Sequence, residues 1–328
     1  MPAGLFGYGD PLDTGGPLDA GDPLDTADLA GRATEGELWS HEQLRALRAR
    51  RFSPPAIAAL LLASQRRADQ VRAACPELAR QVRLWSVAGG CVWVVLVARG
   101  PRAQKRLRAG LAWWTACALM LDWHLGMLET LDGRPRMLGP ADALTLARAW
   151  LVPLAWERPT VTACALAGLT DALDGPLARR RGSTRAGAAF DWIVDACFAA
   201  AALRGASRHR LLDPWAVRAE AAWLGLGAVR ALYAYFVAAG EPDRTLTRAA
   251  RPFAPARMAG LVWGAAGRRR AGSALLGAGA LASVAVSGYQ LARRSRGARR
   301  RRARRGERER AGRASSSSCC PLPVRWSA

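Results

Sequence analysis

The sequence is nearly devoid of lysine and poor in histidine. Lys105 is the single lysine among 48 lysine and arginine residues, so arginine carries almost all of the positive charge. The three histidines, His41, His124 and His209, are isolated, and none stands at a metal-ligand spacing from cysteine or from another histidine. This pattern excludes the usual Cys/His zinc motifs.

Cysteine does not form a disulfide framework either. Four of the seven cysteines lie inside apolar segments, where a free thiol packs as a small hydrophobe, and two more are adjacent in a serine-rich tail: Cys91, Cys117, Cys164 and Cys197, then Cys319 and Cys320. We expect them to be reduced. The N-terminus also lacks a basic segment followed by an apolar one, so no signal peptide is predicted and this end is expected to stay in the cytosol.

Apolar segments, by contrast, are abundant. Hydrophobic residues make up 51% of the chain and cluster in windows, several of which approach the about 20 residues that cross a bilayer. The windows are 84–98, 109–128, 142–156, 160–173, 186–203, 216–237, 256–267 and 272–291. Tryptophans near several window ends are typical of interfacial anchors. We expect an all-α, polytopic membrane helical bundle, with a soluble helical protein as the alternative.

The N-terminal part of the chain changes character near residue 39. Residues 1–38 contain an acidic Pro/Gly-rich repeat with a six-residue period and are predicted to be disordered, because they are too polar to bury a core. Residues 39–82 predict cytoplasmic or interfacial helices. A capping box is expected at Ser40 and Gln43, and a helix break at Pro54. Residues 83–140 are expected to hold extra apolar helices and a connector.

Asp122 and His124 stand inside one of the apolar windows. Residues two apart do not share a helical face, so a metal site formed by this pair is not favoured. We expect Asp122 to have a partner on another helix, or an interfacial position.

The C-terminal segment 292–328 is dominated by arginine. Residues 293–313 contain twelve arginines and two glutamates, a composition that predicts a disordered tail. Three interpretations compete: a solvated cytoplasmic tail, a segment that contacts anionic lipid headgroups, and a nucleic-acid patch. No aromatic residue stands among the arginines to stack on bases, so we expect no nucleic-acid partner.

Four aspartates interrupt the apolar windows between residues 160 and 203. Asp171 and Asp174 fall on one helical face, and Asp191 and Asp195 fall on one face of the following helix. The polar segment between the two pairs predicts a helical hairpin whose facing stripes carry the carboxylates. Burying one unpaired aspartate in a bilayer costs about 2.5–3.5 kcal/mol, so the set must be compensated.

Divalent metal is the most effective compensation for converging carboxylates. Oxygen-only ligands favour Mg²⁺, Mn²⁺ or Ca²⁺, and a two-metal site suits displacement at phosphorus. Arg179 could neutralise one carboxylate. The alternative without metal is a set of helix-capping aspartates, salt-bridged to nearby arginines.

The spacing of these residues resembles the signature of the CDP-alcohol phosphatidyltransferases, integral membrane enzymes of phospholipid synthesis. The matching positions are Asp171, Asp174, Gly175, Ala178, Arg179, Gly187, Asp191 and Asp195. Upstream, LTLARAWLVP resembles the start of the family's first transmembrane helix, with Thr145 and Arg148 at the nucleotide-contacting positions. The similarity covers roughly 141–291.

The resemblance implies a six-helix catalytic core with one or two extra N-terminal apolar helices, a homodimer, and a cell-membrane location with the active site facing the cytoplasm. It implies transfer of a phosphatidyl group from CDP-diacylglycerol or a related CDP-lipid to an acceptor alcohol or alcohol phosphate, with release of CMP. Mg²⁺ or Mn²⁺ would be held by Asp171, Asp174, Asp191 and Asp195, with Asp195 also the general base. CDP or its diphosphate would contact Gly175, Ala178, Arg179, Gly187, Thr145 and Arg148.

The chain departs from the family pattern in three places. Asp142 stands near the position where the family often has asparagine, and Arg257 stands where it often has lysine. If the helix near residue 142 begins in the cytoplasm and windows 84–98 and 109–128 both span the membrane, the basic loop between those two windows lies outside. That location contradicts the positive-inside rule. Either one window is interfacial or the general arginine enrichment obscures the rule.

Two other functions stay open at this stage. A non-catalytic membrane protein could retain the four aspartates as a metal or nucleotide sensor. A protein that binds anionic surfaces or nucleic acid could act through residues 293–313.

Overall fold

The computed structural model describes residues 34–97, 103–129, 135–181, 185–238 and 249–316. Within these ranges the chain is helical, apart from short connections and one isolated bridge between Glu129 and Pro135, so the all-α prediction is confirmed. The α-helices are α2 (Glu35–Ala49), α3 (Pro54–Ala74), α4 (Pro76–Val97), α5 (Ala103–Trp123), α6 (Pro140–Glu157), α7 (Val161–Arg181), α8 (Arg185–Arg208), α9 (Pro214–Tyr233), α11 (Ala254–Ala265) and α12 (Arg269–Ser316).

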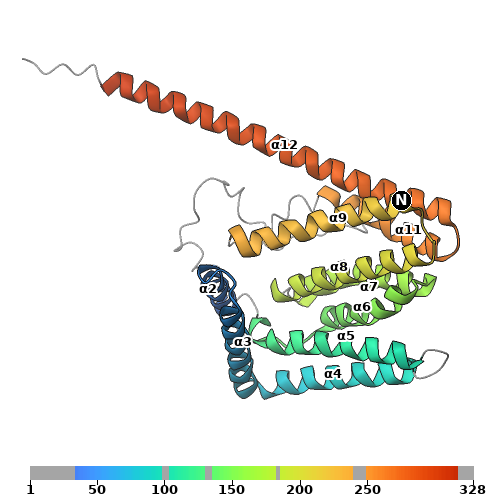
Figure 1. Ribbon diagram of the computed structural model, residues 1–328. Coiled ribbons are helices and arrows are strands. Elements are labelled where there is room, and N and C mark those ends of the chain that lie inside the picture. The colour runs from blue at the N-terminus through green and yellow to red at the C-terminus, as the bar shows by residue number, and fades with distance from the viewer. Residues whose placement is uncertain (1–33, 98–102, 130–134, 182–184, 239–248, 317–328) are drawn as a thin grey trace, which may run out of the picture.

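The helices stack in layers, with α6 at the centre (Figure 1). On one side α5 packs against α6 and α4 packs against α5, while α7 and α8 both pack against α6. On the other side α11 joins α7 to α12, and α9 lies along α12. Helices α2 and α3 run across the ends of this stack (Figure 1). Helix α6 is therefore the element that links the two halves of the bundle.

Two apolar cores support the layers. The first core joins α4, α5 and α6 through buried residues that include Trp93, Trp114 and Ala149. The second core joins α6, α7, α8, α11 and α12 through Ala155, Phe198, Leu276 and their neighbours. Because α6 contributes to both cores, its side chains between them are held in place from two sides.

Helices α11 and α12 cross at a contact made of glycine. A Cβ atom on Gly260 would lie 2.5 Å from the backbone nitrogen of Leu276, and one on Gly272 would lie 2.6 Å from the backbone nitrogen of Gly264. Only residues without a side chain allow the two backbones to approach this closely.

Two helical segments in the described part of the chain are long and apolar enough to cross a membrane. They are Pro214–Ala238, formed by α9 and the π-helical turn η2 (Ala234–Ala238), and Arg269–Arg293, the first half of α12. The sequence windows within α4 to α8 are helical too, but charged residues dilute their hydropathy. Large apolar side chains are exposed on several helices, including Val87, Leu119, Leu169, Ile193 and Leu281.

The start of the described chain corrects one prediction. Helix α2 begins after Thr34, whose side chain accepts a hydrogen bond from the Glu37 backbone N–H at 3.3 Å, so the capping box lies at Thr34 and Glu37. Ser40, predicted to cap, instead donates its hydroxyl to the Gly36 carbonyl. The break at Pro54 is confirmed, because Pro54 opens α3 where a missing N–H costs nothing. The acidic repeat predicted over residues 1–38 lies almost wholly outside the described residues.

The C-terminal segment is a second correction. Disorder was predicted from residue 292, whereas α12 continues without a break to Ser316 (Figure 1). Arginine and alanine have high helix propensity, and extending an existing helix avoids the cost of nucleation. Residues 317–328 lie outside the described part.

The partner of Asp122 is on another helix, as predicted. Arg72 of α3 donates to Asp122 of α5 at 2.5 Å and to Asp69 at 2.5 Å. The hydrogen bond from Arg72 holds the pKa of Asp69 below its usual range. His124 does not join this pair and contacts the Met120 carbonyl at 2.6 Å.

Candidate functional site

Four carboxylates converge beside α6. Asp171 and Asp174 come from α7, and Asp191 and Asp195 come from α8. One carboxylate oxygen from each of Asp171, Asp174 and Asp191 lies within 4.8 Å of the others. Helical spacings of three and four residues put each pair on one face, and α6, which packs against both helices, brings the two faces together.

Arg148 of α6 lies at the centre of this acidic cluster. Its Nη1 donates to Asp191 at 2.9 Å and also contacts Asp195, while Nη2 donates to Asp174 at 2.5 Å. Asp171 is more distant, 3.9 Å from Nη1. The Arg148 side chain is only 2% exposed, so one buried guanidinium faces all four carboxylates. The predicted hairpin therefore has a third helix that takes part in the site.

Two threonines complete the polar contacts of the cluster. The Thr145 hydroxyl lies one turn before Arg148 and donates to Asp191 at 3.2 Å. Arg148 Nε donates to the Thr170 hydroxyl of α7 at 3.3 Å. Sequence reasoning missed Thr170, although its place directly before Asp171 in an otherwise apolar stretch was a usable signal.

The start of α6 fixes the direction in which Thr145 and Arg148 point. Asp142 accepts a hydrogen bond from the Gly139 backbone N–H at 2.7 Å and forms an ion pair with Arg136 at 3.3 Å. An acidic side chain in the first turn stabilises a helix, because its negative charge interacts favourably with the positive end of the helix dipole. Asp142, noted above as a departure from the family pattern, thus stabilises the beginning of α6.

Exposure increases from one end of the cluster to the other. The Asp174 side chain is 8% exposed, Asp191 is 30%, Asp195 is 38% and Asp171 is 51%. The cluster is closed at Asp174 and open at Asp171. Arg251, in the short helix η3 (Arg251–Phe253), is near enough to Asp171 to act on it electrostatically. The open side of the cluster, at Asp171, is therefore the side from which a ligand can reach the carboxylates.

The donor set fits a hard divalent cation. The converging ligand atoms are carboxylate oxygens, with no sulfur or imidazole among them, and such sets favour Mg²⁺, Mn²⁺ or Ca²⁺. Asp171, Asp174 and Asp191 have the geometry to share one ion, and Asp195 is connected to them through Arg148.

Four other predicted site residues lie on the helices that carry the aspartates. Gly175, Ala178 and Arg179 are in the last turns of α7, and Gly187 is in the first turn of α8. Their side-chain surroundings lie outside the described part of the chain. Their predicted contacts with CDP therefore remain predictions.

Arg257 is outside the acidic cluster. It forms a charged pair with Glu220 of α9, with Nε of Arg257 2.8 Å from one Glu220 oxygen, and its guanidinium lies 5.6 Å from the centre of the Trp223 ring. Glu220 is 3% exposed. This pair joins α11 to α9. It gives Arg257 a structural role that requires no contact with substrate.

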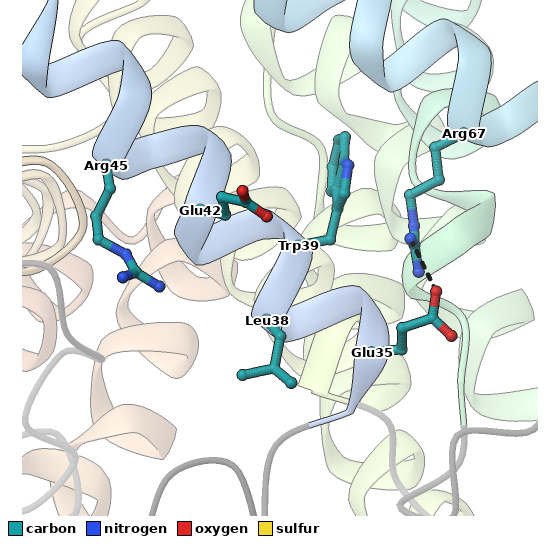
Figure 2. A pocket seen from close by; sticks show the side chains of 6 residues that line it. All are labelled: Glu35, Leu38, Trp39, Glu42, Arg45 and Arg67. Atoms are coloured by element: carbon teal, nitrogen blue, oxygen red, sulfur yellow. Dashed lines mark hydrogen bonds and ion pairs between the residues drawn. The ribbon is translucent and has the colours of Figure 1, made fainter. Parts of the chain in front are cut away.

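A separate hollow of about 470 Å³ lies over α2 and α3. Figure 2 shows the six side chains that line it: Glu35, Leu38, Trp39, Glu42, Arg45 and Arg67. Arg67 pairs with Glu35 at 3.5 Å and lies 5.3 Å from the centre of the Trp39 ring. The lining charges are of both signs and partly paired, and the hollow contains none of the four aspartates.

Comparison with known proteins identifies the region that carries the acidic cluster. Residues 139–267 match the model of the CDP-alcohol phosphatidyltransferase family, a family of membrane-integral phosphotransferases. The match contains Thr145, Arg148 and all four aspartates, and it confirms the resemblance seen in the sequence. No curated protein and no solved structure matches the chain at a significant level.

Proposed function

We propose that this protein transfers a phosphatidyl-type group from a CDP-linked lipid, such as CDP-diacylglycerol, to the hydroxyl of an acceptor alcohol, with release of CMP. The observation that carries the proposal is the convergence of the four carboxylates around Arg148, within the stretch that matches the family. The presence of all four acidic groups at one place is expected of a working phosphotransferase site, whereas a non-catalytic protein has no need of the full set.

Asp171, Asp174, Asp191 and Asp195 would hold Mg²⁺ or Mn²⁺. The bound cations would stabilise negative charge on the oxygens of the diphosphate as the bond to CMP breaks. Thr145 orients Asp191 through its hydroxyl, at 3.2 Å, and so limits the directions in which this carboxylate can present its lone pairs.

Asp195 is the proposed general base. It is more exposed than Asp174, and its carboxylate is not one of the three whose oxygens all lie within 4.8 Å of one another. An oxygen of Asp195 can therefore accept the proton of an acceptor hydroxyl, since a base must reach within hydrogen-bond distance of the proton that it removes.

The remaining family positions are proposed to contact the CDP group. Gly175 and Gly187 would allow close approach of the diphosphate to the helix backbone, and Ala178 would keep the same face open. Arg179 would donate two hydrogen bonds to phosphate oxygens. Arg251, which acts electrostatically on Asp171, would add positive charge near the open end, where an acceptor phosphate would arrive.

The proposed setting is a cell membrane, crossed several times, with the site facing the cytoplasm and the chain paired as a homodimer. In this proposal α6, α7, α8, α9, α11 and α12, as far as the described residues define them, would form the six-helix core that the family resemblance implies. The two long apolar segments and the exposed apolar side chains of the outer helices support this arrangement.

Release of CMP from CDP-diacylglycerol tests the proposal. The purified protein is supplied with Mg²⁺ or Mn²⁺ and a pool of polar alcohols and alcohol phosphates, beside Asp191→Asn and the control Asp213→Asn. Asp213 lies directly before the first residue of α9, where it pairs with Arg269 and not with Arg148. We expect release that requires metal and the pool, that is lost in Asp191→Asn, and that persists in Asp213→Asn.

Retained turnover in Asp191→Asn would place the chemistry elsewhere. If the protein binds nucleotide but releases no CMP with any acceptor or metal supplied, a non-catalytic sensor that retains the four aspartates would be favoured.

A further inference from the structure

Arg148 contacts several carboxylates at once. Its two terminal nitrogens contact Asp174, Asp191 and Asp195, and Nη1 is 3.9 Å from Asp171. One positive charge against four carboxylates leaves a large negative excess in a cluster that is closed to water at Asp174 and open at Asp171. The guanidinium therefore relieves part of the repulsion and cannot remove it.

The carboxylates that contact Arg148 include those of Asp174 and Asp191, two of the three that could hold a metal ion. A guanidinium has donors and no acceptor, so it cannot be a ligand, and it repels a cation placed at the same carboxylates. Arg148 and a divalent ion consequently compete for Asp174 and Asp191. Only two of the three mutually close aspartates are tightly held by Arg148, since Asp171 is the distant and exposed one.

The contact between Arg148 and Thr170 is of a different kind. It runs from Nε, the nitrogen nearest the chain, and it does not involve a carboxylate. This hydrogen bond does not use a carboxylate oxygen, so a metal ion bound by the aspartates does not compete for it directly.

We propose that Arg148 is a resident counter-ion that holds the acidic cluster together before metal binds and that metal loading displaces its terminal nitrogens from the carboxylates. The inference rests on the metal site of the proposed function. It adds that the guanidinium becomes free for an anionic ligand only after the metal has entered. Arg148 is thus a positioning residue in the metal-free protein and an anion-binding residue in the loaded one.

The test measures Mn²⁺ binding directly. Full-length protein in detergent, without CDP-lipid, is titrated with Mn²⁺, and free Mn²⁺ is followed by its electron paramagnetic resonance signal. Thermal unfolding is recorded for the same samples with a chelator and with Mn²⁺. Arg148→Gln is compared with the wild type and with Arg204→Gln, a control on α8 whose guanidinium lies 4.0 Å from the centre of the Trp156 ring.

We expect Arg148→Gln to bind Mn²⁺ about ten-fold more tightly than the wild type, because the competing cation is gone. Its midpoint of unfolding should fall in chelator and recover with Mn²⁺ by more than that of the wild type. Arg204→Gln should leave the Mn²⁺ affinity unchanged. If Arg148→Gln does not fold without metal, Arg148→Lys provides the same test. One ammonium group cannot bridge three carboxylates, so we expect a smaller gain in Mn²⁺ affinity over the wild type.

Unchanged or weaker Mn²⁺ binding in the Arg148 variants, with a wild type that binds, would overturn this inference alone. A wild type that binds no Mn²⁺ would overturn both the inference and the metal-dependent function.

Discussion

Asp174 and Asp195 differ in their surroundings although both contact Arg148. Asp174 is closed off from solvent and belongs to the three aspartates whose oxygens converge, whereas Asp195 is more open and stands beside them. The two positions should therefore contribute differently to metal binding and to proton removal.

Single substitutions should separate these roles. Asp174→Asn is expected to weaken Mn²⁺ binding more than Asp195→Asn does, because it removes a ligand of the convergent group. Asp195→Asn is expected to lower kcat by about 10²-fold or more, the usual contribution of a general base. Mn²⁺ titration and steady-state CMP release on both variants check this. Equal losses of affinity and kcat in the two variants would contradict separate roles.

At this scale the spacing of the aspartates was sufficient to predict that they converge, since helical geometry fixes which residues share a face. The identity of their counter-charge was not predictable from spacing. Arg179 is near the aspartates in sequence, but the structure puts Arg148, from the preceding helix, among all four. Which arginine reaches a carboxylate depends on how α6 packs against α7 and α8, and that is set by the two apolar cores.

At the scale of elements, the glycine contact between α11 and α12 controls how α11 is held against α7. Met258 of α11 packs on Gly168 of α7, one turn before the aspartates of that helix. A change in the distance between α11 and α12 would therefore shift α7, the helix that carries Asp171 and Asp174.

Gly272→Ala and Gly288→Ala form a matched pair on α12. A Cβ at residue 272 would lie 2.6 Å from the backbone nitrogen of Gly264, whereas one at residue 288 would meet nothing within 4 Å. Gly272→Ala is expected to destabilise the protein by about 1–3 kcal/mol through overpacking. Gly288→Ala should be neutral or slightly stabilising, since alanine favours a helix. Thermal unfolding in detergent measures both, and equal midpoints would refute the role of the close crossing.

The helices themselves were largely predictable, because each apolar window overlaps a helix of the structure over most of its length. Their ends were not, as α2 and α12 show. The cap at Thr34 competes with another plausible cap at Ser40, and the choice depends on tertiary contacts, such as that of the Gly36 N–H with Glu129 at 3.1 Å.

At the scale of the whole molecule, the arginine-rich end of α12 extends away from the bundle (Figure 1). The acidic cluster lies on helices that pack around α6, and its contacts come from α6, α7 and α8. The tail and the cluster are therefore independent parts of the chain.

Deletion of residues 294–328 tests that independence, because it retains the apolar half of α12. We expect CMP release in neutral detergent micelles to stay within about two-fold of the full-length value, since charges beyond about 8 Å are screened at physiological salt. Loss of release from a folded truncated protein would show that the tail belongs to the catalytic machinery.

The 48-residue length of α12 has a mechanical consequence. The helix is about 72 Å long, and the part beyond Arg293 accounts for about 35 Å of it. A rod of that kind is a lever: a rotation of about 10° where it leaves the bundle would carry its far end through about 6 Å. Small rearrangements among α9, α11 and α12 would be magnified there, so a fluorophore near Ser316 would report them more sensitively than one placed within the bundle.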